Sequence, residues 1–192
     1  GKDSCYAAHL LKYKYGMKPL TVTWSPILKT DYGKENFKNW LSSGKFDNIT
    51  AKRSEDLTRF LTTQAVKNLL HPFHVFILGQ KVFPIKIALK LGIPLVFYGE
   101  NEAEHGNPLA DNFTSLRKNS YHTFNNRDKL FISGIKLKDL ISKHRFKEKD
   151  LEVFLPPKLE DFHKSNIEVH YLGYYKKWIQ QEAFYYSVEN CN

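Results

Sequence analysis

Cysteine is scarce in this sequence, because Cys5 and Cys191 are the only two among 192 residues. They lie at opposite ends of the chain. Two cysteines make neither a disulfide framework nor a four-ligand zinc site. A reducing compartment is the simpler environment, so we expect a cytoplasmic protein. A long apolar run is also missing and the mean hydropathy is −0.48, so we expect no membrane-spanning segment and no membrane partner.

The composition is that of a folded protein with an excess of positive charge. Hydrophobic residues make up 42% and charged residues 26%, which argues against intrinsic disorder. The net charge of +9 is typical of proteins that bind nucleic acid, an anionic surface or a polyphosphate ligand. However, the lysines between Lys136 and Lys149 alternate with acidic residues, which favours a solvated helical region over a binding groove.

Hydrophobic periodicity predicts strands that alternate with helices. Helices are expected at 4–15, 31–44, from Ser54 onward, 81–91, 135–143 and 176–188. Strands are expected at 19–24, 46–51, 93–98 and 169–175, with loops and some helix over 109–134 and a polar linker at 156–166. The strand at 93–98 is nearly all apolar, as a central parallel strand covered on both faces should be. This order predicts an α/β fold with a doubly wound, mostly parallel sheet. Residues 1–155 would form the main domain and 156–192 its C-terminal continuation.

The first four residues, Gly1, Lys2, Asp3 and Ser4, lead directly into the first expected helix. Backbone N–H groups at a helix start, beside a lysine, suit a phosphate group. Asp3 could hold Mg²⁺ on that phosphate. The alternative is an ordinary capping turn, with Asp3 or Ser4 as the cap.

A second polar segment follows the strand at 93–98. It contains Gly99, Glu100, Asn101, Glu102 and Glu104. Ligands of parallel α/β sheets bind beyond the carboxyl ends of the strands, where these carboxylates could coordinate Mg²⁺ or orient a nucleophile. The alternative is a polar loop without a chemical role.

Two further pairs are candidate contacts for a nucleotide or a sugar. Trp24 and Ser25 end the strand at 19–24, and Trp24 could either border an adenine or belong to the core. Gln80 and Lys81 stand at the start of the helix expected at 81–91 and offer an amide and an ammonium group.

The termini have the character of interior sequence, because the chain opens on Gly1 where an initiator methionine would stand. We therefore expect a fragment of a longer protein, in which a strand precedes Gly1. Without that strand two neighbouring strands would each lack a partner. The isolated chain is then expected to be marginally stable or prone to aggregation.

The opening tetrapeptide is similar to the end of the PP-loop, SGGxDS, of ATP pyrophosphatase-type enzymes. More of the chain resembles the N-acetyl sugar amidotransferase family of lipopolysaccharide and nonulosonic-acid (pseudaminic and legionaminic acid) biosynthesis. The segments that carry this resemblance cover about a third of the chain: GKDSCYAAHLLKYKYGMKPLTVTWSP, GQKVFPIKIALKLGIPLVFYGENEAEHGNP and VHYLGYYKKW.

The resemblance implies an adenine nucleotide alpha hydrolase-like (Rossmann-like) fold whose first strand is missing here. It also implies an AMP-forming reaction with ATP and Mg²⁺ as cofactors. That reaction converts the acetamido group of a nucleotide-linked sugar into an acetamidino group. The ammonia would come from a partner glutaminase, since the chain has no glutaminase nucleophile motif of its own.

The resemblance also implies roles for individual residues. Gly1, Lys2, Asp3 and Ser4 would bind pyrophosphate and Mg²⁺, and Trp24 and Ser25 would flank adenine or ribose. Gly99, Glu100 and Asn101 would line the site of acyl transfer, Glu104 would handle Mg²⁺ or ammonia, and Gln80 and Lys81 would lie near the nucleotide or sugar. Lys2, Asp3, Glu100 and Glu104 are the residues expected to act in catalysis.

Two alternatives stay open. The first is a PP-loop enzyme that adenylates and modifies tRNA, although such enzymes commonly carry sulfur on cysteines and no Cys-x-x-Cys motif is present. The second is a non-catalytic domain that binds nucleic acid through its basic and aromatic residues. Most of the aromatic residues fall at helical or strand spacing, which fits a core better, so nucleic acid is the less favoured partner.

Overall fold

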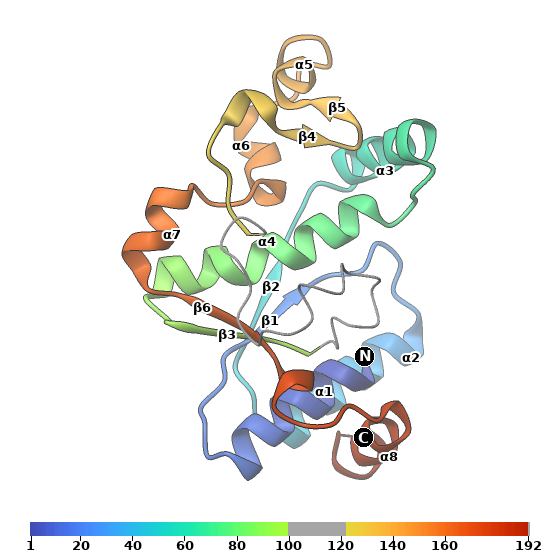
Figure 1. The fold of residues 1–192 in the computed structure, drawn as a ribbon. Helices are drawn as coiled ribbons and strands as arrows, with labels where there is room; N and C mark the ends of the chain where they lie inside the picture. Colours follow the sequence, from blue (N-terminus) through green and yellow to red (C-terminus); the bar gives the residue numbers. More distant parts are fainter. Residues whose placement is uncertain (100–121, 192) are drawn as a thin grey trace.

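The computed structural model describes residues 1–99 and 122–191, which form helices and short strands in alternation (Figure 1). The first part of the chain contains, in order, α1 (Lys2–His9) with a π-helical extension η1 (Leu10–Lys14), β1 (Thr21–Trp24), α2 (Asp31–Gly44), β2 (Asn48–Ala51), α3 (Glu55–Leu69), α4 (His74–Leu91) and β3 (Leu95–Tyr98). The second part contains η5 (Arg127–Lys129), β4 (Phe131–Ile132), β5 (Ile135–Lys136), α5 (Leu137–Ser142), α6 (Glu148–Leu151), η6 (Glu152–Phe154), α7 (Leu159–Ser165), β6 (Glu168–Tyr171), η7 (Leu172–Tyr174) and α8 (Gln180–Cys191).

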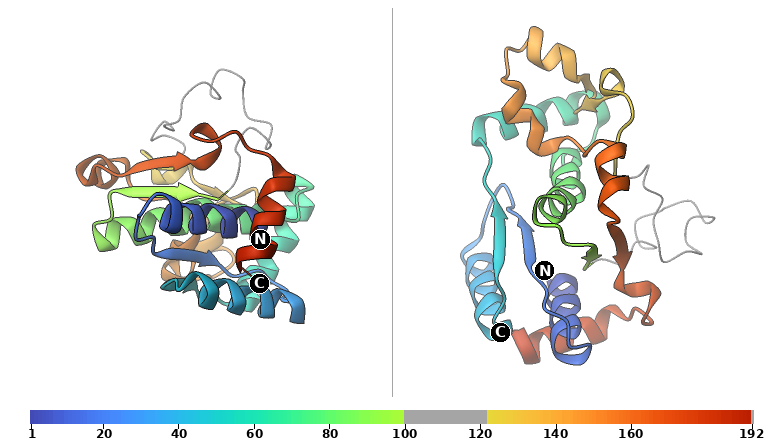
Figure 2. Two further views of the ribbon diagram at one scale, coloured as in Figure 1. Left: turned by 90° about the horizontal axis from the view of Figure 1, so that it is seen from below. Right: turned by 90° about the vertical axis from the view of Figure 1, so that its left-hand side faces the viewer.

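The strands form two parallel pairs and one hairpin. β1 pairs with β2 in parallel, with Thr21 opposite Asn48, and β3 pairs with β6 in parallel, with Leu95 opposite Glu168. Within the described residues, β1 pairs only with β2 and β3 only with β6. α4 packs against both β1 and β3 and so connects the two pairs (Figures 1 and 2). The mixed helix and parallel-strand architecture agrees with the α/β class predicted from the sequence.

Local sequence signals predicted several helix boundaries correctly. Thr30 Oγ1 accepts a hydrogen bond from Gly33 N at 3.0 Å and caps α2. Ser54 Oγ accepts from Leu57 N at 3.4 Å and caps α3, as predicted. Such caps satisfy N–H groups that have no partner inside the helix. At the other end of α4, Gly92 has φ +65°, the left-handed conformation that commonly ends a helix.

Two hydrophobic clusters form most of the core. The larger one joins α3, α5 and η6 to the end of β1, and its fully buried members include Leu61, Leu140 and Leu151. The second lies between α4 and the β3–β6 pair, where Ile85 packs with Val96 and Val169. Leu95 is 38% exposed, so β3 is not covered on both faces as predicted for a central strand.

The start of α4 differs from the prediction. The helix begins at His74 and not at 81, and Pro84 lies inside it. Proline favours the first turn of a helix because it lacks an N–H group, and the sequence pattern therefore suggested a later start. Burial of Val75, Gly79, Val82 and Ile85 on one side shows that tertiary packing extends the helix through the preceding turn.

The second part of the chain also departs from the prediction at two points. The segment 156–166 is not a polar linker, because Leu159–Ser165 forms α7 and buries Phe162. The end of the stretch predicted as loop-rich, 109–134, contains β4, which pairs with β5 at the first two residues of the helix predicted at 135–143. The turn residues of this hairpin, Ser133 and Gly134, both have positive φ, which is typical of the tight turn that joins two antiparallel strands.

Within the described residues, no single helix is both long and apolar enough to cross a membrane. α3 and α4 pass that test only when taken together, and they meet at a bend of 118°.

Candidate functional site

The first turn of α1 carries the predicted phosphate-binding residues. Gly1 caps the helix and no side chain hydrogen-bonds to the cap. Lys2 Nζ contacts Asp3 Oδ1 at 2.6 Å, and each of the two side chains is 32% exposed. Ser4 is exposed. The partial positive charge of a helix start and the Lys2 ammonium both favour an anion at this place.

The carboxyl end of β3 lies against this first turn. A Cβ atom added to Gly99 would lie 2.5 Å from Ser4 Cα and 2.9 Å from Ser4 N. Only glycine permits two backbone segments to approach so closely. The fold therefore brings the last residue of Gly1–Ser4 against the first residue of the segment that starts at Gly99.

Trp24 belongs to the core, which was one of its two predicted roles. It is 6% exposed, and its ring packs against Phe83 and Phe154. A Cβ atom on Gly79 would lie 1.9 Å from Trp24 Cε2, so α4 approaches the indole through a glycine. Ser25, the next residue along the chain, is half-buried.

Gln80 and Lys81 lie well inside α4 and not at its start, which corrects the predicted setting of both residues. Both residues still lie near the ends of two strands, β1 and β3. Gly79 touches Trp24, the last residue of β1. The Tyr98 hydroxyl, at the end of β3, donates a hydrogen bond to Lys81 O at 2.7 Å. This turn of α4 therefore lies at the carboxyl ends of both β1 and β3.

The remaining predicted site residues, Glu100, Asn101 and Glu104, lie outside the described residues. Their roles stay predictions.

A hydrogen-bonded series of three side chains, which the sequence did not predict, runs from Glu168 at the start of β6 through His170 to Tyr175, just after η7. His170 Nε2 lies 3.0 Å from Glu168 Oε2, and His170 Nδ1 lies 2.5 Å from the Tyr175 hydroxyl. His170 is 8% exposed, whereas Tyr175 is 55% exposed. A carboxylate, a buried imidazole and an accessible hydroxyl in this order can transfer a proton between a ligand and the protein.

The β3 segment links this series to the first turn of α1. The Phe97 ring centroid lies 5.7 Å from that of His170 and 6.1 Å from that of Tyr175. Phe97 is two residues from Gly99, which touches Ser4. The sequence contains a signal for part of this series, because Glu168 and His170 are two residues apart in a strand and therefore lie on the same face. Tyr175 follows only after a turn of 3-10 helix, and its contact with His170 depends on that turn.

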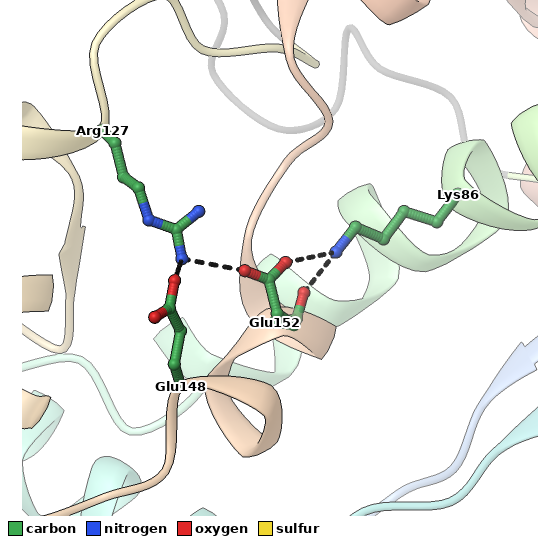
Figure 3. Close-up of polar contacts among 4 residues, drawn as sticks. All are labelled: Lys86, Arg127, Glu148 and Glu152. Atoms are coloured by element: carbon green, nitrogen blue, oxygen red, sulfur yellow. Dashed lines mark hydrogen bonds and ion pairs between the residues drawn. The ribbon is translucent and has the colours of Figure 1, made fainter.

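A network of ion pairs connects α4 to the second part of the chain (Figure 3). Glu152 accepts a hydrogen bond from Arg127 Nη2 at 2.8 Å and lies 3.5 Å from Lys86 Nζ, and Arg127 also pairs with Glu148. Burial raises the pKa of Glu152, but Arg127 and Lys86 outweigh it and the net pKa is lowered. Burial lowers the pKa of Lys86 more than Glu152 raises it. Each residue is paired, so the network is best explained as a structural link.

Asp3 is the predicted magnesium ligand that lies within the described residues. Within residues 1–99 and 122–191, no group of three or more His, Cys, Asp and Glu side chains could hold a metal. Mg²⁺ commonly uses only one or two protein carboxylates and takes its other ligands from phosphates and water. A single half-exposed carboxylate at a helix start that is predicted to bind phosphate is consistent with that pattern.

A separate cavity of about 690 Å³ lies beside the β4–β5 hairpin. Its lining includes Lys136, Lys138 and Lys143 together with Phe131, whose side chain is 50% exposed. Asp139, which also lines the cavity, pairs with Lys143 at 3.3 Å. The cavity is open and basic, and it is formed by elements other than α1 and β3.

The site at α1 therefore combines a helix start, a lysine, a carboxylate and a close glycine contact, and the Glu168–His170–Tyr175 series lies against Phe97 of the adjoining strand β3. No protein-family model matches this sequence, and a comparison with curated proteins finds no match either.

Proposed function

We propose that this protein is an ATP-dependent, AMP-forming amidotransferase that converts an acetamido group of a nucleotide-linked sugar into an acetamidino group. The contact between Gly99 and Ser4 carries this proposal. It joins the predicted phosphate-binding turn to the predicted acyl-transfer segment, two motifs that are far apart in the sequence. The proposal includes membership of the N-acetyl sugar amidotransferase family, which the sequence resembles.

The proposal includes a finer description of the fold. The pairs β2–β1 and β3–β6 would be two parts of one Rossmann-like sheet, with a further parallel strand between β1 and β3. Two observations support this arrangement. α4 packs on both β1 and β3, and α1 begins beside the carboxyl end of β3. A strand in that position would satisfy the backbone groups along the open edges of both neighbours.

ATP would bind with its phosphates at the first turn of α1. The N–H groups of this turn and the Lys2 ammonium would neutralise negative charge on the departing pyrophosphate. Asp3 would hold Mg²⁺, which supplies further charge neutralisation at the phosphates when bound. Ser25 and Gln80, both half-buried at the carboxyl ends of the strands, would contact the nucleoside or the sugar.

The chemistry needs an activated amide, because an amide carbon is a poor electrophile. The acetamido oxygen attacks the α-phosphorus, pyrophosphate leaves, and the proton on the amide nitrogen is released. Ammonia from a partner glutaminase then adds to the imidate carbon, gives up a proton, and AMP departs with the original oxygen. The Tyr175–His170–Glu168 series could accept these protons, with Glu168 stabilising the imidazolium.

The test uses the full-length protein with Mg-ATP, an ammonium salt and a panel of UDP- and CMP-linked N-acetylated sugars. We expect AMP and pyrophosphate to form only with the correct sugar, whose acetamido oxygen is replaced by NH. The Lys2→Ala variant should lose most AMP formation, because the substitution removes the ammonium group at the start of α1. The Lys34→Ala variant is the matched control, since Lys34 forms an exposed pair with Asp31. Failure to form AMP with any sugar would refute the proposal.

The basic cavity beside the hairpin favours a second candidate, a PP-loop enzyme that modifies tRNA. Lysines beside an exposed aromatic ring are suited to a nucleic acid backbone and a stacked base. In that case AMP formation would require tRNA and ignore sugars, and RNA binding would weaken steeply with salt. The Lys136→Ala and Lys138→Ala variants would weaken that binding, whereas sugar-dependent AMP formation should not change in them.

A further inference from the structure

The two cysteines of the chain meet in the folded protein, although 185 residues separate them in the sequence. Cys5 lies in the first half of α1 and Cys191 is the last residue of α8, and these helices pack side by side (Figure 1). Cys191 is 4% exposed and lies in a cluster with Ala8 and Trp40, against which Cys5 packs. Cys5 itself is half-buried.

The chemical environments of the two sulfur atoms differ. Cys191 donates its S–H to Cys5, and this hydrogen bond lowers the pKa of Cys5 to about 7 although burial opposes it. The same hydrogen bond and burial raise the pKa of Cys191. The more accessible Cys5 is therefore the cysteine that ionises more readily to the thiolate, which is the reactive form of cysteine. Cys191 holds the proton beside it.

We propose that Cys5 and Cys191 form a reversible disulfide when the protein meets a low-molecular-weight disulfide such as oxidised glutathione. This inference does not depend on the proposed amidotransferase function. Reversible disulfides of this kind occur in reducing compartments as redox-sensing bonds.

The reaction proceeds by two thiol–disulfide exchanges. The Cys5 thiolate attacks one sulfur of oxidised glutathione, a mixed disulfide forms, and one glutathione thiolate leaves. Cys191 then loses its proton to solvent, its sulfur attacks Cys5 Sγ, and the second glutathione thiolate leaves. Two protein thiols are oxidised, one glutathione disulfide is reduced, and the departing thiolates take up protons according to pH.

The bond would strengthen an existing connection between α8 and the first turn of α1. Ser187 Oγ on α8 already donates a hydrogen bond to Lys2 O at 2.9 Å. Tyr6, which follows Cys5, packs against Tyr186 of α8 with ring centroids 5.2 Å apart. Oxidation would therefore fix α8 against the helix start that carries Lys2 and Asp3.

The test treats the full-length protein at pH 7.5 with oxidised glutathione, blocks free thiols with an alkylating reagent, and measures intact and peptide masses. We expect the loss of two hydrogen atoms, no alkylation at either cysteine, a crosslinked peptide that contains both, and full reversal by dithiothreitol. We also expect oxidation to raise the thermal unfolding midpoint by several degrees. Recovery of two alkylated cysteines, or of only a glutathione adduct on wild-type protein, would overturn the proposal.

Two variants separate the steps. Cys191→Ser should accumulate a stable glutathione adduct on Cys5, because no second thiol resolves it. Cys5→Ser should remain unmodified, because Cys191 is buried. An adduct on Cys191 in the Cys5→Ser variant at the wild-type rate would contradict the assigned roles. The mass measurement on wild-type protein decides the proposal even if a variant fails to fold.

Discussion

The substitution Gly99→Ala tests most sharply whether the end of β3 and the start of α1 form one site. The added Cβ would lie 2.5 Å from Ser4 Cα. Ordinary carbon contacts need at least about 3.4 Å, so one of the two backbones must move by about 1 Å. Such overpacking costs about 1–3 kcal/mol of stability. For a protein of this length that lowers the thermal midpoint by about 2–12 °C.

The effect on activity should exceed the effect on stability. A displacement of about 1 Å at groups that position a substrate can reduce the rate by about a hundredfold. We therefore expect kcat/KM for sugar-dependent AMP formation to fall by about that factor, measured below the unfolding temperature of the variant. The assay is initial-rate AMP release, alongside thermal unfolding followed by circular dichroism.

The control is Gly92→Ala at the end of α4. A Cβ there meets nothing within 4 Å, but Gly92 has φ +65°. The control should therefore lose about 1–2 kcal/mol from backbone strain while kcat/KM stays close to that of the wild type. Wild-type activity in Gly99→Ala, or an equal loss of activity in both variants, would show that the Gly99 contact has no special relation to the chemistry.

Three further outcomes are expected. The Glu152→Gln variant should lose about 1 kcal/mol of unfolding free energy at low salt and less at high salt, measured by urea unfolding, because the half-exposed ion pairs of Glu152 with Arg127 and Lys86 are screened by salt. Asp31 is 97% exposed, so Asp31→Asn is the control and should change the stability very little. Burial, and to a smaller extent His71, lowers the pKa of His74 from 6.5 in the folded protein. The contribution of neutral His74 to stability is therefore present above pH 6.5 and is lost as the pH falls through the lower folded pKa, by at most about 1.4 kcal/mol per pH unit. The His74→Gln variant should show a smaller pH dependence of stability in that range, and an unchanged slope would contradict the assignment. Tyr175→Phe should reduce kcat by at least about tenfold and alter its pH profile if the relay transfers protons, whereas Tyr185→Phe, on an exposed part of α8, should leave both as they are.

The sequence allowed good predictions where local signals decide the structure. Thr30 and Ser54 cap helices through their own side chains, and Gly92 ends α4 through its own backbone conformation. α4 was predicted too short because Pro84 is a strong local signal, and the packing that overrides it comes from β1 and β3. α7 was missed because it is one short helix that buries little besides Phe162.

The candidate site was predictable in its parts but not in its assembly. The composition of Gly1–Ser4 and of the segment after Gly99 indicates phosphate and metal chemistry at each place separately. Their contact depends on the path of the chain through three helices and three strands, which no local pattern encodes. The same holds for Tyr175 with His170 and for Cys5 with Cys191, since each pair requires a turn or a helix packing that only the tertiary structure supplies.

The fate of one oxygen atom tests the central claim most directly. The full-length protein would be given Mg-ATP, ammonium and the active nucleotide sugar labelled with oxygen-18 in its acetamido carbonyl, and AMP would be analysed by mass spectrometry. Because the acetamido oxygen attacks the α-phosphorus and leaves with it, the account predicts that the label appears in the phosphate of AMP and is lost from the sugar. Unlabelled AMP beside a sugar that keeps its label would contradict the proposed chemistry.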